Sequence, residues 1–488
     1  MLYDKTNPKS IETYGKAMIG RTFKDIATNP VNYNIIANTK FIKESVSKTT
    51  ESYIATHEKK AYKGGLGTII EECYFGYKAN SDAQPDFLEA GVELKVTPYK
   101  ETKKGLAAKE RLVLTKINYM DIVNEEDFNH SHLWFKSRLI LLVWYLHQIN
   151  KLQSTIDYVQ LFTPPDEDLE IIIEDYNKIV TKIKDGKAHE LSEGDTLYLG
   201  ACTKGATSKD RSPQPFSEIP AKPRAFSFKN SYMTYVLNNY IIPGKTTYEH
   251  IVKGHTTNFE NYVVDKISEY AGKTIDELCD IFNIANRTSK NLQSMLAFKI
   301  LGVSGNHAAE FEKAGIAVKA IRIAKNGKIK ESMSFPTIKY DELALETWEN
   351  STFGNYLRDT RFFFVIYEED ENATLHLKRC MFWNIPYEDL EGNVKDVWQE
   401  MHDIVANGKI TLSRGRGNTI ENNFPKASVN PVSHVRPHAR DREDTAQLPP
   451  DTKVNTTETG LWPYSDRYTK HCFWLNNSYI LEQIKNNP

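Results

Sequence analysis

Two acidic residues and a lysine stand close together at the start of a short segment in which apolar and polar residues alternate. Six residues separate Asp86 from Glu93, and one residue separates Glu93 from Lys95. Successive strand residues point to opposite faces, so Glu93 and Lys95 lie side by side on one face. Crowded carboxylates stay ionised together only around a cation, and all-oxygen ligands favour Mg²⁺. Such a site suits phosphodiester hydrolysis, with Lys95 orienting or stabilising the attacking hydroxide.

Two further residues extend this candidate site. Glu72 lies in the segment 68–76, which is typical of a helix that ends at Gly76. If this helix packs on the sheet, Glu72 points to the same place. Lys136 stands at the entry to an apolar run and is a candidate contact to the scissile phosphate. The competing interpretation is a solvated cross-strand pair of Glu93 and Lys95, but here the polar face interrupts a strand that is expected to be buried.

The elements that must position these residues are short strands mixed with helices. Val92, Leu94 and Val96 alternate with polar residues, which predicts a strand. The apolar runs 139–146 and 362–367 are too short for a long helix and predict buried strands. Segments of both kinds in each half favour the α/β or α+β class. Neither apolar run approaches the roughly 20 residues needed to span a bilayer.

Composition places the chain among ordinary globular proteins with two or three domains. It has 488 residues, of which 40% are hydrophobic and 26% charged, and its formal net charge is -2. This excludes a polybasic protein, although a local basic cleft remains compatible with it. The five cysteines form no CxxC pair, and the N-terminus lacks the apolar core of a signal peptide. We therefore expect a cytoplasmic protein without a disulfide framework or a thiolate zinc site.

The two halves of the chain contain similar segments in the same order, which is the signature of a repeat. Residues 86–95 are echoed by residues 310–319. Lys136 and its apolar run are echoed by Arg358 and the run that follows it. The other echoes pair residues 20–26 with 272–278, 185–187 with 407–409, and 226–232 with 473–479.

Five ordered echoes predict a duplicated domain. The first domain spans residues 1–244, a linker follows at 245–259, and the second domain spans 260–488. Residues 411–460 are rich in Pro, Gly, Asn and charge, so we expect a long loop or a partly disordered insertion there.

The motifs of the first half together resemble the MutH family, which comprises the mismatch-repair nicking endonuclease and the GATC-cutting type II restriction endonucleases. The resemblance is carried by PDFLEAGVELKVTP with Glu72 fourteen positions before Asp86, by KERLVL from Lys109 and by SHLWFKSRL around Lys136. HELSEG, TKGA and RAFSFKNSYMT further along resemble the restriction branch. The resemblance covers nearly all of residues 10–245.

This resemblance implies a restriction-endonuclease-like PD-(D/E)xK core of the α/β class, Mg²⁺ as cofactor and GATC as the recognised sequence. By the match, the catalytic residues are Glu72, Asp86, Glu93, Lys95 and Lys136, with Asp86 and Glu93 as metal ligands.

DNA contacts follow from the match and from two basic segments of the first half. Lys204 matches a DNA-contacting lysine of the family. Ser227 aligns with the tyrosine by which the repair enzyme senses adenine methylation, so we expect cleavage irrespective of that methylation. The DNA-binding residues expected are Lys109, Arg111, Lys204, Arg224, Ser227, Lys229, Arg358, Lys426 and Asn476.

The second half departs from the family pattern at the catalytic positions, where it has Glu310, Ala317 and Lys319. Without the strand carboxylate this copy is expected to be a dead nuclease. The resemblance implies that it binds a second copy of the site as an allosteric effector.

The function predicted is therefore a Mg²⁺-dependent type II restriction endonuclease of a restriction-modification system. A palindromic site needs two cuts and the chain offers one active site, so two chains meet on DNA as a homodimer or one chain nicks twice. The alternatives are a MutH-like strand-nicking repair endonuclease and a non-catalytic DNA-binding regulatory protein.

Overall fold

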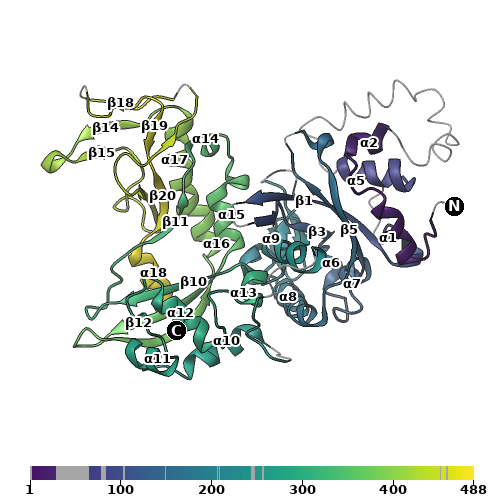
Figure 1. The fold of residues 1–488 in the computed structure, drawn as a ribbon, viewed down its shortest axis with the longest axis horizontal. Coiled ribbons are helices and arrows are strands. Elements are labelled where there is room, and N and C mark those ends of the chain that lie inside the picture. The colour runs from purple at the N-terminus through teal and green to yellow at the C-terminus, as the bar shows by residue number, and fades with distance from the viewer. Residues whose placement is uncertain are drawn as a thin grey trace. The chain divides into compact units, whose positions relative to one another are not determined.

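A computed structural model describes residues 3–28, 65–78, 84–102, 105–148, 150–205, 207, 209–242, 248–254, 258–450, 452–457 and 460–487. The chain divides into two compact units (Figure 1). Unit 1 comprises Met1–Phe259 and Ala308–Gly315, and unit 2 comprises Glu260–His307 and Ile316–Pro488. The sequence placed every residue from 260 onward in the second domain, so the segment Ala308–Gly315 departs from that prediction. The predicted linker lies partly outside the described residues.

The central sheet of unit 1 has the strand order β2-β1-β4-β5. Strand β1 runs parallel to β4, whereas β1 with β2 and β4 with β5 are antiparallel pairs. Strand β4 is apolar throughout and almost completely buried, as its sequence predicts. The bounds are β1 Glu93–Thr102, β2 Gly105–Ala108, β4 Ile140–Leu146 and β5 Ile156–Phe162.

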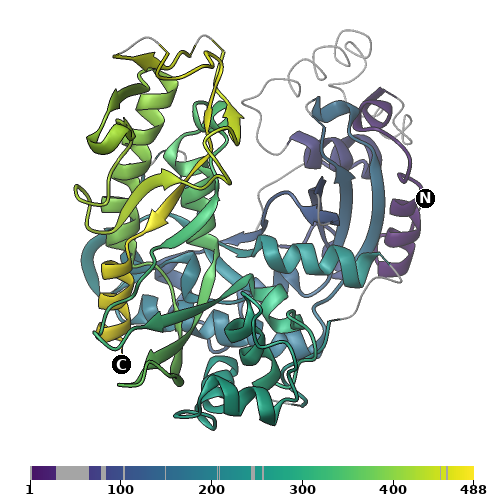
Figure 2. The same ribbon diagram turned by 60° about the vertical axis from the view of Figure 1, so that its left-hand side comes forward.

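Helices near the N-terminus pack against this sheet through a shared apolar cluster that includes Ile11, Phe23, Ile70, Leu94 and Val143. Figure 2 shows α1 beside the strands, near the N label. The helix predicted to end at Gly76 does so, with Gly76 in the left-handed conformation, and its second part is a π-helical turn. These elements are α1 Pro8–Lys16, α2 Phe23–Thr28, α5 Gly65–Ile69 and the π-helix η1 Ile70–Phe75.

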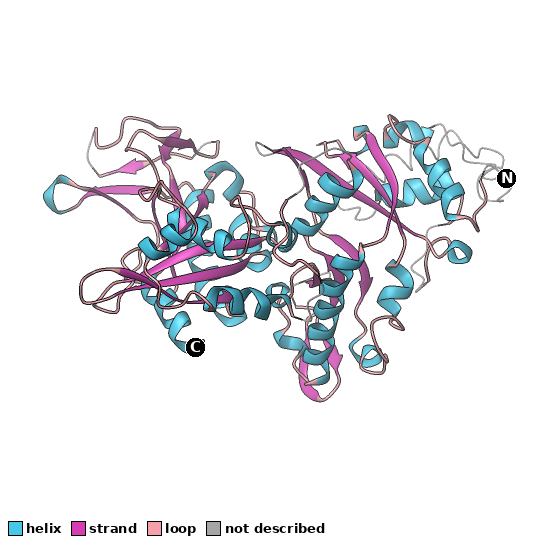
Figure 3. Ribbon diagram, turned by 60° about the horizontal axis from the view of Figure 1, so that its bottom comes forward, coloured by secondary structure: helices cyan, strands magenta, loops and turns pink. Residues whose placement is uncertain are grey.

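A second sheet of unit 1 has the order β3-β9-β6. It is formed by β3 Leu112–Lys116, β6 Leu199–Thr203 and β9 Arg224–Phe228, and a separate hairpin pairs β7 Ser212–Gln214 with β8 Ser217–Ala221. The helices of unit 1 that follow or precede these strands are short except for α8, and Figure 3 distinguishes helices from strands by colour. They are α6 Tyr119–Ile122, α7 His132–Ser137, α8 Asp166–Lys184, α9 Asn230–Tyr235 with its π-helical continuation η6 Val236–Ile241, and α13 Ala309–Ala314.

Unit 2 repeats the strand arrangement of unit 1. Strand β10 runs parallel to β12, which pairs in antiparallel fashion with β13, just as β1, β4 and β5 do. The register is also repeated, because Ala317 lies opposite Phe362 where Glu93 lies opposite Ile140. The bounds are β10 Ile316–Ile323, β12 Arg361–Glu369 and β13 Leu375–Trp383, with α10 Phe259–Ser268, α11 Ile275–Ile281 and α12 Leu292–Ile300.

The second sheet of unit 2 has the order β11-β20-β16, which parallels β3-β9-β6. Its strands are β11 Met333–Thr337, β16 Ser433–Pro437 and β20 His471–Leu475. The helices of this part are α14 Tyr340–Leu343, α15 Thr352–Asp359, α16 Tyr387–Asp389 continued by the π-helix η8 Leu390–Val394, α17 Lys395–Ala406 and α18 Asn477–Asn486.

The segment 411–460 is not the long loop or disordered insertion that its composition predicted. It contains short strands, and β17 pairs with β19 just beyond the segment. The reason is that Leu412, Phe424 and Leu448 are all buried and fasten the polar stretches between them. The strands are β14 Thr411–Arg414, β15 Ile420–Asn422, β17 Thr445–Gln447, β18 Asn455–Thr456 and β19 Arg467–Thr469.

All five cysteines are free thiols. Within the described ranges, no helix combines the length and the apolar character needed to cross a bilayer.

Candidate active site

Four of the predicted catalytic residues lie together at the start of two parallel strands. Lys95 Nζ lies 2.6 Å from Glu93 Oε1, and Lys136 Nζ lies 3.6 Å from the same oxygen. Asp86 Oδ2 accepts a 2.8 Å hydrogen bond from the backbone N–H of Leu94. The structure thus brings Asp86, Glu93, Lys95 and Lys136 together, and their catalytic role stays a prediction.

The chain reaches this arrangement through a tight turn before β1. Phe87 and Val92 form an isolated antiparallel bridge, and both backbone N–H groups donate across it. Gly91 closes the turn with φ 64°, a conformation that favours glycine. Lys136 is in the last turn of α7, shortly before β4. Because β1 and β4 are parallel, their starts meet at one edge, and Lys136 arrives beside Glu93.

The carboxylates of this site are largely removed from water. The Glu93 side chain is 3% exposed, and among the described residues its Oε2 has no hydrogen-bond partner. The pKa of Asp86 is raised to about 6, chiefly by burial and next by the neighbouring charge of Glu93. The Leu94 N–H and the ammonium groups of Lys95 and Lys136 oppose this rise. The site thus holds acidic oxygens in a setting that favours an added cation.

The helix that precedes the site contributes Glu71. The pKa of Glu71 is raised to about 7, chiefly by burial and next by the charge of Asp86. Glu72 and Glu93 raise it by less, and Lys95 lowers it. Glu71 is therefore electrostatically part of the cluster. Sequence reasoning missed it, because the spacing to Asp86 selected Glu72. The signal in the sequence was the pair of consecutive acids, Glu71 and Glu72, either of which could belong to the site. Both lie in the π-helical turn η1, where the side-chain directions differ from those of an α-helix.

The donor set fits a divalent cation that is completed by substrate. No group of three or more His, Cys, Asp or Glu side chains in the described residues is arranged to hold a metal on its own. Mg²⁺ in nucleases and related enzymes is held by one or two carboxylates together with waters and phosphate oxygens. Asp86 and the unpartnered Oε2 of Glu93 supply such a pair.

The predicted DNA-binding residues of unit 1 fall into two groups. Lys109 and Lys204 are exposed and available to phosphates. Arg111 forms an ion pair with Glu193, and its side chain is 22% exposed.

Arg224, Ser227 and Lys229 are buried, which contradicts their assignment as DNA contacts in this conformation. The guanidinium of Arg224 donates to the backbone carbonyls of Ala201 and Leu191, and the amine of Lys229 donates to that of Thr196. Both side chains therefore hold the β3-β9-β6 sheet to its neighbouring segments. Ser227 is fully covered by protein, so its small size opens no space for a methylated base here.

In unit 2, one of the three predicted contacts is well exposed. Lys426 is 54% exposed and pairs with Glu421. Arg358 is bound to Glu391 and lies over the ring of Trp348. Asn476 is buried. Its side-chain amide donates to a backbone carbonyl, and its side-chain oxygen lies 2.6 Å from His434 Nδ1. Both observations contradict its assignment as a DNA contact.

At the strand position where the first copy has Glu93, the second copy has no carboxylate. Ala317 occupies the strand position of Glu93, and Lys319 that of Lys95. Burial alone lowers the pKa of Lys319. Glu310, which aligns with Asp86, belongs to unit 1, whereas Lys319 belongs to unit 2. The acid and the amine of the second copy are therefore divided between the two units.

Comparison with known proteins agrees with this geometry. The family described as "DNA mismatch repair enzyme MutH" matches residues 75–175 and 302–395, one stretch in each half. The type II restriction enzyme Sau3AI of Staphylococcus aureus is 37% identical over 481 residues, covering 91% of this chain and 96% of the relative. The chain belongs to this MutH-like family. The family assignment made from the motifs is confirmed, and the two matched stretches of the MutH-like chain contain β1 with β4 and β10 with β12.

Proposed function

We propose that this MutH-like protein is a type II restriction endonuclease that hydrolyses double-stranded DNA at GATC. The observation that carries the proposal is the cluster of Asp86, Glu93, Lys95 and Lys136 in unit 1. Similarity to a type II restriction enzyme over 91% of the chain supports the same reaction class. We assign the sheet β2-β1-β4-β5 as a PD-(D/E)xK core, with Asp86 supplying the first acid of the motif.

Bound Mg²⁺, held by Asp86 and Glu93, would supply Lewis-acid polarisation of the phosphoryl oxygen and lower the pKa of a water. Lys95, fixed by Glu93 Oε1, donates to the attacking oxygen and stabilises its negative charge. Lys136 neutralises the scissile phosphate from the entry to β4. Glu71 adds an acidic group whose protonation changes near neutral pH.

We assign the second copy a binding role, in which it engages another GATC site as an allosteric effector. The absence of a carboxylate at Ala317 supports binding without cutting, since this strand position carries no negative charge that would repel a phosphate. Among the described residues each chain has one complete cluster, and a palindrome needs two cuts, so we propose that two chains act together on DNA or that one chain nicks twice. The expected insensitivity to adenine methylation depends on the sequence match of Ser227 alone, and complete protection of adenine-methylated GATC DNA would contradict it.

A strand-nicking repair enzyme is the second candidate, favoured by the family description of a mismatch repair enzyme. Product analysis separates the two. A nicking enzyme leaves open-circular plasmid without linear fragments, whereas a restriction enzyme leaves fragments bounded by GATC.

The test is digestion of unmethylated plasmid with Mg²⁺ by the wild type, by Glu93→Gln and by Glu101→Gln. Glu101 is a matched control, because it lies on the same strand and is exposed. Fragments from the wild type and the control but not from Glu93→Gln support the proposal. Equal cutting by Glu93→Gln, or no cutting by any of the three, would overturn it.

A further inference from the structure

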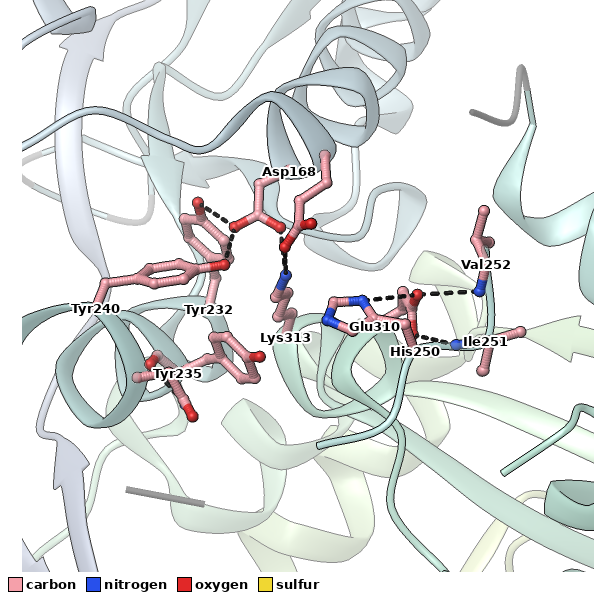
Figure 4. A network of polar contacts seen from close by, with 11 residues as sticks. Asp168, Tyr232, Tyr235, Tyr240, His250, Ile251, Val252, Glu310 and Lys313 are labelled. Atoms are coloured by element: carbon pink, nitrogen blue, oxygen red, sulfur yellow. Dashed lines mark hydrogen bonds and ion pairs between the residues drawn. The ribbon is translucent and has the colours of Figure 1, made fainter. Parts of the chain in front are cut away.

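The helix α13 comes from the second half of the sequence but belongs to unit 1. Its Lys313 side chain is only 1% exposed. Lys313 Nζ lies 2.5 Å from Asp168 Oδ1, which is equally buried, and 3.3 Å from Glu167 Oε1 (Figure 4). Removing one partner of so deeply buried an ion pair leaves the other charge uncompensated, which strongly destabilises the fold. We therefore expect the fold to need both Lys313 and Asp168, or neither charge.

Aromatic side chains complete the surroundings of the pair. The hydroxyls of Tyr232 and Tyr240 donate to Asp168 Oδ2 at 3.0 and 2.9 Å. Lys313 Nζ also lies 4.8 Å from the ring centre of Tyr235, a cation–π distance. Figure 4 shows these rings gathered around the amine and the carboxylate. Both oxygens of Asp168 are therefore satisfied, one by the lysine and the other by the tyrosines.

The three tyrosines stand on α9 and η6, which also hold the two edge strands of the central sheet. Asn238 Nδ2 donates to the carbonyl of Leu106 in β2 at 2.8 Å. Gln160 of β5 donates to the backbone carbonyl of Tyr240 at 3.3 Å. Because the strand order is β2-β1-β4-β5, this helical segment bridges both edges of the sheet that carries the active site.

The other end of α13 is fixed by Glu310. Its carboxylate accepts backbone hydrogen bonds from Ile251 and Val252 at 3.0 and 3.2 Å and faces His250 at 3.4 Å. Glu310 aligns with the catalytic Asp86, so the second copy uses its former acid to dock a helix. After Gly315, which has φ 67°, the chain enters β10 at once.

We propose that Lys313 is a positioning residue for DNA cleavage, supplied to the catalytic unit by the degenerate copy. By neutralising Asp168, Lys313 keeps the tyrosines of α9 and η6 in place. This helical segment in turn contacts both edges of the sheet that presents Glu93 and Lys95. This role rests on the proposed function. Since α13 leads directly into β10, a ligand that binds the second copy acts on the same helix, which makes Lys313 the connection between effector binding and cutting.

The experiment uses the full-length protein with Lys313→Met, Lys313→Arg, the double variant Lys313→Met with Asp168→Asn, and Lys339→Met. Lys339 is a control, since it is 68% exposed and its ion pair with Glu342 lies on the surface. The double variant removes both charges, so it avoids the uncompensated buried carboxylate. Single-turnover rates are measured against DNA concentration on duplexes with one and with two GATC sites.

A positioning role predicts that Lys313→Met and the double variant lower the single-turnover rate about tenfold or more, with half-saturation by DNA changed by less than roughly twofold. Stimulation by a second site is lost in both, while Lys313→Arg restores most of the rate and Lys339→Met matches the wild type. A folded double variant that cuts at the wild-type rate would overturn the proposal.

Amide hydrogen exchange provides a readout that does not depend on cutting. Lys313→Met is expected to raise exchange in residues 230–241 and 105–108, and Lys339→Met is not. Unchanged exchange in both segments would refute the positioning role even if the wild type cuts DNA. If the wild type fails to cut, the proposed function falls, and exchange alone decides the role of Lys313.

Discussion

Lys95 lies 2.6 Å from one carboxylate oxygen of Glu93, and the other oxygen of that carboxylate has no hydrogen-bond partner among the described residues. The two oxygens thus have separate surroundings, because one contacts the amine and the other is buried without a hydrogen-bond partner. Buried polar atoms are rarely left unpartnered in folded proteins. A cation held by Asp86 and Glu93, as proposed above, would give this oxygen a partner.

Replacing Glu93 by Gln should abolish cutting more completely than it disturbs folding. The amide keeps the shape but removes the charge that holds Lys95 and attracts the metal, so we expect the rate to fall roughly a hundredfold or more. Raising Mg²⁺ should recover part of the loss. The rate as a function of Mg²⁺ concentration measures this, and an unchanged Mg²⁺ requirement would show that Glu93 is not a ligand.

The two consecutive acids of the π-helical turn can be separated by substitution. Glu71→Gln should lower the cutting rate and alter its pH profile, because Asp86 and Lys95 both influence the pKa of Glu71. Glu72→Gln should have the smaller effect. The comparison needs only initial rates of both variants across pH. A larger loss in Glu72→Gln would restore the assignment made from sequence spacing.

Mg²⁺ binding should weaken on acidification. The pKa of Asp86 is raised from 3.8 to about 6 and that of Glu71 from 4.5 to about 7, so the folded, metal-free protein binds more protons than the unfolded chain between these values. The contribution of these two carboxyls to the free energy of unfolding is therefore highest below about pH 4, and it is lost as the pH rises to about 7.

A metal that needs the ionised forms is favoured in the opposite direction. We expect the Mg²⁺ affinity at about pH 5.5 to be roughly fourfold weaker than at about pH 8 from Asp86 alone. Calorimetric titration of Mg²⁺ at the two pH values checks this. Equal affinities would mean that neither carboxyl must lose a proton.

Restoring the strand carboxylate of the second copy should not restore a nuclease. In a Glu93→Gln background, Ala317→Glu places an acid beside Lys319, but Glu310 remains in the other unit, bound to backbone N–H groups. We expect no cutting above the Glu93→Gln background in a plasmid assay. Recovery of GATC fragments would show that the second copy can still assemble a site.

Buried and exposed basic residues should respond differently to removal of charge. Arg224→Met should destabilise the protein by about 2 kcal/mol or more, because two backbone carbonyls lose a charged donor. Lys204→Met should leave the melting temperature unchanged and reduce the salt dependence of DNA binding by about one ion. Melting curves and salt titrations distinguish the two, and a stable Arg224→Met variant with weakened DNA binding would reinstate Arg224 as a contact.

Local patterns predicted much of the fold. The alternation around Leu94, the apolar run before Leu146 and the glycine at Gly76 produced the expected strands and helix end, because burial and a left-handed residue act over a few positions. The repeat was visible for the same reason, and its register is preserved between Ala317 and Phe362.

The features that the sequence could not predict depend on contacts across the fold. Glu71, whose pKa responds to Asp86, lies beside Glu72 in a π-helical turn, and a sequence pattern does not show that such a turn is present. The sequence around Arg224 does not show that its guanidinium donates to two backbone carbonyls far away in the chain. The composition of residues 411–460 resembled a loop because three buried side chains are few among many polar ones.

The segment Ala308–Gly315 comes from the second half of the sequence but belongs to unit 1, and this has a consequence for both halves. With Ala317 at the strand position of Glu93, the Glu310 carboxylate accepts backbone hydrogen bonds instead of belonging to a pair of catalytic acids. In unit 1 the buried Asp168 is paired with Lys313, a lysine from the second half of the sequence. We therefore expect that deleting the second half would leave Asp168 buried without its lysine, so that the cutting half would depend on a half that does not cut.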